Sequence, residues 1–156
     1  MPTDATIFIT GGTGFVGTEV QKALAGHPLK LLVRPGTTGP RNPGATYVSG
    51  DVTEPASLSG TMDGCSTVIH LVAIIEERGD ATFDRVIRQG TDNVVAEAKL
   101  AGVERIILMS AMGVRNDPSY PYFFAKHRAE EAVQQSGLPW TIFRPSIIFG
   151  PGDGFI

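Results

Sequence analysis

The fold is decided by Thr10-Gly11-Gly12-Thr13-Gly14-Phe15-Val16-Gly17, which follows the apolar run Ile7-Phe8-Ile9 and precedes a helical pattern. This order predicts a strand, a glycine turn and the start of a helix. Gly11 suits the tight turn, Gly14 lets a pyrophosphate approach the backbone, and Gly17 lets the helix pack close to the strand. Free N–H groups and the helix dipole then attract phosphate. The whole stretch therefore predicts dinucleotide binding, with a purely structural glycine turn as the alternative.

Composition limits the class of protein. With 156 residues, 42% apolar and 19% charged, the chain is expected to form one domain, residues 1–156. A net charge of −3 favours neither nucleic acid nor anionic lipid as a partner. No apolar run approaches the roughly 20 residues that cross a bilayer, and the N-terminus, with Asp4, lacks the basic start of a secretory signal. The lone cysteine, Cys65, is expected to be buried rather than reactive. We therefore expect a cytoplasmic protein with no membrane insertion and no metal site.

Short apolar runs alternate with helical patterns along the chain, which predicts a parallel sheet with crossover helices. Continuous apolar runs fit strands that are covered on both faces. The expected strands are Thr6–Thr10, Leu29–Val33, Thr46–Ser49, Thr67–Val72, Arg105–Met109 and Trp140–Phe143. The predicted fold class is therefore α/β, a Rossmann-type doubly wound parallel sheet of about six strands with helices on both faces.

Three apolar stripes at helical spacing predict the crossover helices. Their members are Val16, Val20 and Leu24; Phe83, Ile87, Val94 and Ala98; and Ala125, Ala129, Ala132 and Val133. A glycine follows the end of each stripe, where a residue in the left-handed conformation is expected to close a helix. These glycines are Gly26, Gly102 and Gly137.

The end of the second strand should lie beside the adenosine ribose, about 20 residues past the glycine turn. A carboxylate there would select an unphosphorylated ribose, but this chain has Val33-Arg34-Pro35-Gly36. Arg34 could form a fork with a 2′-phosphate, and Arg41 could assist from the following loop. NADP is therefore slightly favoured over NAD, and an exposed surface arginine is the alternative interpretation of Arg34.

Two more strand ends are expected to border the cofactor. Gly50-Asp51-Val52 closes the third strand, where Asp51 either accepts from the adenine amino group or caps the next helix. His70-Leu71-Val72-Ala73 closes the fourth strand and should lie along the middle of the cofactor. The expected cofactor-binding positions here are Asp51 and Val52, and Leu71, Val72 and Ala73. His70 is expected to be packed rather than catalytic.

The candidate chemistry follows the fifth strand, in Ser110 and in the pair Tyr122 and Lys126. A spacing of four residues puts Tyr122 and Lys126 on one face of a helix, where the ammonium can lower the pKa of the phenol and hold a nicotinamide ribose. Such a phenol can pass a proton to or from a carbonyl oxygen during hydride transfer. The Ser110 hydroxyl could bond the same carbonyl, and a turn or helix-capping serine is the alternative. Tyr122, Lys126 and Ser110 are thus the candidate catalytic residues.

The chain resembles the short-chain dehydrogenase/reductase superfamily, in its extended and atypical branch of NAD(P)-dependent epimerase/dehydratase-like proteins. The resemblance spans nearly the whole chain. Besides the glycine turn and the Tyr122/Lys126 pair, it is carried by Gly50-Asp51-Val52, Gly90-Thr91-Asp92-Asn93-Val94, Ala101-Gly102-Val103 and Arg144–Asp153. Within the superfamily, Met109–Gly113 and Trp140–Ser146 look most like bacterial relatives of the nucleotide-binding accessory subunit of respiratory complex I.

The resemblance implies a role for each matching residue. Gly11, Gly14 and Gly17 would hold the pyrophosphate, Asp51 the adenine, and Ala73 the nicotinamide side. Tyr122 with Lys126 would bind the ribose and transfer the proton, and Pro145 would shape the nicotinamide pocket. Two features depart from the family pattern: Ser110 stands only 12 positions before Tyr122, and no asparagine precedes Gly90-Thr91.

Relatives of this kind continue beyond the final loop, Gly150–Ile156, into a C-terminal substrate lobe, so the resemblance implies that the domain is truncated and that the substrate, an unknown small molecule, is not recoverable. Apolar surface left without that lobe would favour a homo-oligomer. Three functions are considered: an NAD(P)-dependent oxidoreductase or nucleotide-sugar epimerase/dehydratase, a nucleotide-binding accessory or sensor protein without turnover, and a scaffold that binds nothing.

Overall fold

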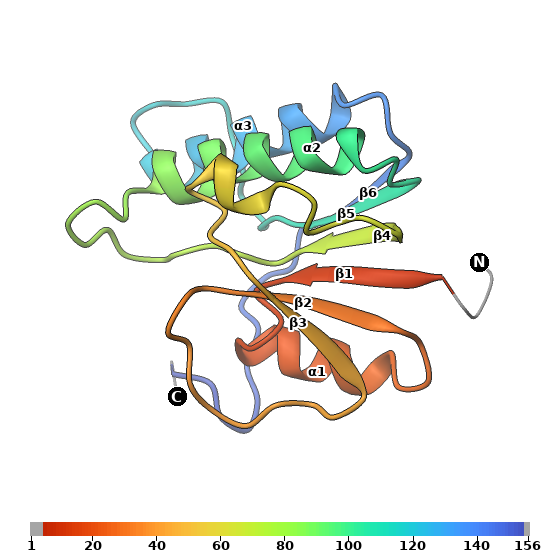
Figure 1. Ribbon diagram of the computed structural model, residues 1–156. Coiled ribbons are helices and arrows are strands. Elements are labelled where there is room, and N and C mark those ends of the chain that lie inside the picture. Colours follow the sequence, from red (N-terminus) through yellow and green to blue (C-terminus); the bar gives the residue numbers. More distant parts are fainter. Residues whose placement is uncertain (1–4, 155–156) are drawn as a thin grey trace.

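The computed structural model describes residues 5–154, which form one six-stranded parallel sheet (Figure 1). Asp4 and Phe155–Ile156, used in the sequence predictions, lie outside the described residues. The strands are β1 (Thr6–Thr10), β2 (Leu29–Val33), β3 (Ala45–Ser49), β4 (Cys65–His70), β5 (Arg105–Met109) and β6 (Trp140–Phe143). Their order across the sheet is β3-β2-β1-β4-β5-β6, and every neighbouring pair is parallel.

Helices cover both faces of this sheet. Helix α1 (Phe15–Ala23) packs on one face, and the other helices lie on the opposite face in Figure 1. These are a 3₁₀ turn, η1 (Pro55–Leu58), a π-helix, η2 (Asp84–Gln89), which runs directly into α2 (Gly90–Leu100), and α3 (Pro121–Gln134). The predicted fold class, a doubly wound Rossmann-type α/β domain, is confirmed. Among residues 5–154, no helix combines the length and apolar character that a membrane span needs.

The fourth strand lies two residues earlier than the predicted Thr67–Val72. Pairing between β1 and β4 ends at Thr10 opposite His70, because β1 turns away at Gly11. Leu71 therefore has no partner residue in β1. Its N–H still donates to the Thr10 carbonyl, at 3.2 Å. Because β4 ends at His70, the segment after it leaves the sheet and borders the space at the carboxyl end of the strands.

The predicted helix ends agree with the structure. Gly26, Gly102 and Gly137 have φ values of 94°, 75° and 81°, the left-handed conformation that a side chain disfavours. Cys65 is buried at the start of β4, as expected, and burial raises the pKa of its thiol.

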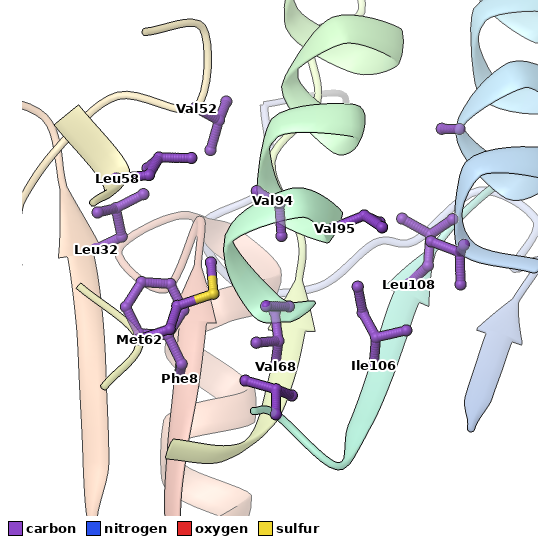
Figure 2. Close-up of a cluster of buried hydrophobic side chains, with 14 of the residues drawn as sticks. Phe8, Leu32, Val52, Leu58, Met62, Val68, Val94, Val95, Ile106 and Leu108 are labelled. Atoms are coloured by element: carbon purple, nitrogen blue, oxygen red, sulfur yellow. The ribbon is translucent and has the colours of Figure 1, made fainter. Parts of the chain in front are cut away.

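The main hydrophobic core lies between the sheet and helices α2 and α3 (Figure 2). Phe8 is at its centre, since β1 is paired on both sides and the Phe8 side chain is fully buried. The labelled side chains in Figure 2 converge on this layer from four strands, α2, η1 and the turns on either side of η1: Phe8, Leu32, Val52, Leu58, Met62, Val68, Val94, Val95, Ile106 and Leu108. A second cluster, which includes Ile7, Ile9 and Leu31, packs under α1.

Several large apolar side chains are exposed on β6 and in the segment that follows it. Trp140 and Phe143 are 45% and 55% exposed, and Ile147 and Phe149 beyond β6 are more exposed still. Contiguous apolar surface of this kind favours association. The expected homo-oligomer stays a prediction.

Replacement of Phe8 by alanine is expected to lower the free energy of unfolding by about 3–5 kcal/mol, because it removes a fully buried ring and leaves a cavity. Urea denaturation measures the loss. Leu100→Ala is the matched control, since Leu100 is 84% exposed on α2, and it should change the free energy by less than about 0.5 kcal/mol. Equal losses in the two variants would contradict this assignment of the core.

Candidate functional site

The glycine turn joins β1 to α1 through close backbone packing. Gly11 has a φ of 70°, and its carbonyl accepts from the Gly14 N–H at 3.2 Å. A Cβ on Gly17 would lie 2.2 Å from the Gly11 carbonyl oxygen, so only glycine lets α1 approach the turn this closely. Gly12 is buried beneath the turn, where a Cβ would lie 2.8 Å from a Leu31 methyl carbon. The sequence predictions for Gly11 and Gly17 as the tight turn and the close packing position are confirmed.

A cleft of about 810 Å³ opens at the carboxyl end of the sheet. It lies where β1 is flanked by β2 on one side and β4 on the other, the point at which ligands of open α/β sheets bind. The structure brings most of the predicted cofactor-binding residues to its wall: Gly11, Thr13, Gly14, Phe15, Val16, Gly17, Arg34, Asp51, Val52, Leu71, Val72 and Ala73. Gly12 supports this wall from below without lining it.

The N-terminus of α1 faces this cleft without a capping side chain. Gly14 is the N-cap residue, and no side-chain oxygen bonds the first N–H groups of the helix. Its extended backbone, with φ −78° and ψ −178°, is open to any residue, and a Cβ there would meet only the Gly11 carbonyl oxygen, at 3.4 Å. Uncapped amides and the positive end of the helix dipole form an anion site. The residues present therefore fit a pyrophosphate.

Arg34 and Arg41 are separated by the structure. The Arg34 carbonyl accepts from the N–H and the hydroxyl of Thr37 in a tight turn, which leaves the exposed Arg34 side chain at the cleft. Arg41 instead stacks over the Tyr47 ring, 4.4 Å from its centre, and lines a neighbouring hollow of about 600 Å³. Assistance from Arg41 is thus not supported, because its guanidinium stacks on Tyr47 and Arg41 does not line the cleft.

Asp51 closes a local turn at the cleft. Its Oδ1 accepts from the N–H and the hydroxyl of Thr53, both at 2.8 Å. The following turn, η1, has Glu54 as its N-cap and no side-chain cap. The helix-cap alternative for Asp51 is therefore wrong, since its carboxylate bonds ahead of η1, and the adenine role stays a prediction.

The segment after β4 packs directly on the glycine turn. A Cβ on Gly11 would lie 3.1 Å from the backbone of Leu71 and Val72, so the two walls of the cleft touch. His70, just before this segment, is 1% exposed, which confirms the expectation that it is packed.

Tyr122 and Lys126 lie on one face of α3, as predicted, but outside the lining of the cleft. The Lys126 Nζ is 5.9 Å from the centre of the Tyr122 ring and donates to the Met109 carbonyl at 3.1 Å. Tyr122 sits edge-on to Phe83 and Phe123, and burial raises the pKa of its phenol. The expected lowering of this pKa is not found, because burial disfavours the charged phenolate and Lys126 makes no opposing contribution.

Lys126 is itself unusual, since its side chain is almost fully buried. Burial lowers the pKa of Lys126 to about 8, although the nearby Glu130 carboxylate opposes the change. A lysine in this range exists in both protonation states near neutral pH, which suits a group that positions or exchanges a proton.

Ser110 is buried at the end of β5, away from the lining of the cleft. Among residues 5–154 its hydroxyl has no hydrogen-bond partner. It nevertheless lies close enough to the Glu130 carboxyl to lower the pKa of that group. Burial raises the pKa of Glu130, while the hydrogen bonds from Arg144 and the nearby Ser110 hydroxyl lower it, and the net change is downward. Ser110 is buried near Glu130 and does not line the cleft, and its contact with a substrate carbonyl stays a prediction.

Glu130 and Arg144 tie α3 to the segment after β6. The Glu130 side chain is 2% exposed and accepts from both the Nε and a terminal nitrogen of Arg144. Pro145, next to Arg144, accepts from the Met112 N–H at 2.8 Å. Pro145 therefore joins the ends of β5 and β6, beside the candidate catalytic side rather than in the cleft.

Sequence reasoning missed an ion pair at the mouth of the cleft. Arg85 of η2 and Glu54 both line the cleft, and a guanidinium nitrogen of Arg85 lies 2.7 Å from the Glu54 carboxylate. The two residues are 31 positions apart, so no local spacing could have indicated this contact. Within residues 5–154, no group of three or more His, Cys, Asp and Glu side chains is placed to hold a metal ion.

Fold and cleft together define a dinucleotide-binding α/β protein of the short-chain dehydrogenase/reductase type. The family model described as NAD(P)H-binding matches residues 11–152, and the chain belongs to this family.

Three relatives place the chain within this superfamily. The chain is 35% identical over 98% of its length to a ceramide reductase from Caulobacter vibrioides, and 31% identical over 94% to a 3-beta-hydroxysteroid dehydrogenase from Mycolicibacterium neoaurum. It spans about half of these curated relatives, 50% and 48% of their lengths. A solved short-chain dehydrogenase/reductase superfamily protein from Agrobacterium tumefaciens with bound NAD matches with a TM-score of 0.73 at 29% identity, over 89% of this chain and 48% of that one. None of these three is a complex I subunit.

The pKa of Lys126 predicts a pH-dependent stability. Because the folded-state pKa is about 8 and the unfolded value is 10.5, this lysine contributes most above pH 10.5 and least below pH 8. The stability of the wild type relative to Lys126→Met should therefore rise by about 3 kcal/mol between pH 8 and pH 10.5. Urea denaturation of both proteins across this range measures it, and a pH-independent difference would contradict the buried ammonium.

Proposed function

We propose that this chain binds NAD(P)(H) in the cleft and forms the cofactor-binding half of an oxidoreductase of the short-chain dehydrogenase/reductase type. The observation that carries the proposal is the uncapped N-terminus of α1 at the switch point of the sheet. Membership of the NAD(P)H-binding family supports it. The names of the relatives, a ceramide reductase and a hydroxysteroid dehydrogenase, support an oxidoreductase over an epimerase or dehydratase.

Each wall of the cleft would hold one part of the dinucleotide. The amides around Thr13–Gly17 would bind the pyrophosphate, and Asp51 with Val52 would face the adenine. Arg34, at the end of β2, would contact the adenosine ribose and would favour its 2′-phosphate, hence NADP. Leu71–Ala73 would direct the nicotinamide toward α3.

The bound cofactor supplies a hydride donor or acceptor. Lys126, anchored on the Met109 carbonyl, would hold the nicotinamide ribose. The Tyr122 hydroxyl would give a proton to the substrate carbonyl oxygen in reduction, or take it from the alcohol in oxidation. The raised pKa of Tyr122 keeps the phenol protonated, which suits it as the acid for reduction.

The side chains near Tyr122 favour a carbonyl on an apolar substrate. Phe83 and Phe123 flank the phenol, and Met112 and Tyr120, from the loop between β5 and α3, are exposed. The relatives named for ceramide and hydroxysteroids act on molecules of this kind, whereas a nucleotide sugar would require polar partners here.

A second candidate is a nucleotide-binding accessory or sensor protein, as in the relatives of the complex I subunit that the sequence motifs resemble. Two observations favour it: Ser110 is buried and does not line the cleft, and burial rather than a neighbouring cation shifts the pKa of Tyr122. A chain used in this way would bind the dinucleotide without turnover. Cytoplasmic localisation stays a prediction for both candidates.

The cofactor site is tested by calorimetric titration with NAD, NADH, NADP and NADPH. Gly14→Val fits the backbone but fills the space beside the α1 amides, so it should weaken binding by at least about tenfold with little loss of stability. Arg34→Ala should weaken NADPH binding about tenfold more than NADH binding, since a charged hydrogen bond to a phosphate is lost. Arg41→Ala is the matched control and should leave this preference unchanged. Wild-type protein that binds none of the four cofactors would overturn the proposal.

Turnover is tested with Tyr122→Phe, which removes only the hydroxyl. In the complete protein, with a ceramide and a 3β-hydroxysteroid as trial substrates, kcat should fall about 10²–10⁴-fold while the cofactor Kd stays within about twofold. Cofactor binding by the wild type without turnover of either substrate class would favour the accessory role.

A further inference from the structure

His70 lies behind the cleft and is hydrogen-bonded to residues of two elements that border it, Thr10 and Thr91. It ends β4 beside Thr10, the last residue before the glycine turn, and it precedes Leu71, which lines the cleft. Its ring also reaches Thr91, at the junction of η2 and α2. The imidazole is 1% exposed, so it touches no bound ligand itself.

The hydrogen bonds around His70 have a single consistent direction. Thr91 Oγ1 lies 2.6 Å from the Ile87 carbonyl, which can only accept, so the Thr91 hydroxyl donates there. Thr91 Oγ1 must then accept from His70 Nε2, at 3.1 Å, which places the imidazole proton on Nε2.

The other ring nitrogen completes the chain of bonds. With the proton on Nε2, Nδ1 is an acceptor, and the Thr10 hydroxyl donates to it at 2.6 Å. Thr10 Oγ1 in turn accepts at 3.2 Å from the Leu71 N–H, which it shares with the Thr10 carbonyl oxygen. Each side-chain polar atom of Thr10, His70 and Thr91 therefore has a hydrogen-bond partner, and such a satisfied network specifies one arrangement of the three side chains.

Each end of this series belongs to a wall of the cleft. Thr10 fixes the start of the glycine turn, and Leu71 begins the segment that packs on Gly11, where an added Cβ would lie 3.1 Å from the backbone of Leu71. At the other end, Ile87 lies in η2 next to Val86, which also lines the cleft. π-Helical segments are rare and are frequent at functional sites. The bond from Thr91 to the Ile87 carbonyl therefore helps to hold an unusual segment that borders the cleft.

We propose that His70 is a positioning residue of the dinucleotide cleft, a neutral imidazole that holds the glycine turn and the segment after β4 at a fixed distance from η2. The proposal rests on the proposed function, because it concerns the geometry of the same cofactor site. Burial, with a smaller contribution from the charge of Lys126, lowers the pKa of His70 to about 3, so the imidazole stays neutral near pH 7.

The test combines cofactor titration with a double-mutant cycle. His70→Phe keeps an aromatic ring and removes both hydrogen bonds of the imidazole. Thr91→Val keeps the shape of the side chain and removes the hydroxyl that accepts from Nε2 and donates to the Ile87 carbonyl. Val68→Ala is the matched control, since Val68 lies two residues earlier on the same face of β4 and is fully buried, yet has no polar role. Calorimetry with NADH and NADPH gives Kd, and thermal unfolding gives the stability of each variant.

His70→Phe and Thr91→Val are each expected to raise the Kd about tenfold. The double variant should lose little more cofactor affinity than either single variant, because both remove the same hydrogen bond. Val68→Ala should lower the melting temperature without changing Kd more than about twofold. In the wild type, ¹⁵N NMR of the imidazole should find the proton on Nε2 and none on Nδ1. If His70→Phe does not fold, Thr91→Val decides.

If the wild type binds the cofactor, two results overturn the inference and leave the proposed function standing. One is that the His70 and Thr91 variants have Kd values no higher than that of Val68→Ala. The other is a proton on Nδ1 of His70. Absence of cofactor binding by the wild type overturns the proposed function, and the role of His70 falls with it.

Discussion

Close packing between α1 and the glycine turn is the constraint on which the rest of the structure depends. Gly17 places the helix where a Cβ would lie 2.2 Å from the Gly11 carbonyl oxygen, and Gly11 allows the turn that makes this approach possible. The first amides of α1 therefore lie at the end of the central strand β1. Since β1 has β2 on one side and β4 on the other, the anion site and the cleft fall at the same place.

Two sets of buried polar groups organise the surroundings of this cleft. His70, Thr10 and Thr91 connect the strands of the cofactor side to η2 through neutral hydrogen bonds. On the α3 side, the Glu130 carboxylate and the Lys126 ammonium are buried and engage Arg144 and the end of β5. Burying charge is costly unless it is paired, so these contacts specify where α3, and with it Tyr122, lies relative to the sheet.

The elements of the fold were predictable because apolar period and glycine position are local signals. Five of the six strands match the predicted runs to within a residue, and the closing glycines have the expected conformation. β4 begins and ends two residues before its predicted range, since its end depends on where β1 stops pairing and not on its own apolar residues. The glycine turn, Arg34 and Asp51 were likewise brought to one cleft by strand ends that the sequence identifies. Their roles toward a cofactor stay predictions.

By itself, the sequence determined the class of fold, the glycine turn and the residues at the carboxyl ends of the strands, because each depends on neighbours within a few positions. Only the tertiary structure decided which way side chains face and what they touch. It buried Ser110, stacked Arg41 on Tyr47, anchored Lys126 on Met109 and paired Arg85 with Glu54. Burial and partners set the charge state of a residue, and both come from segments that are distant in the sequence but adjacent in the folded chain.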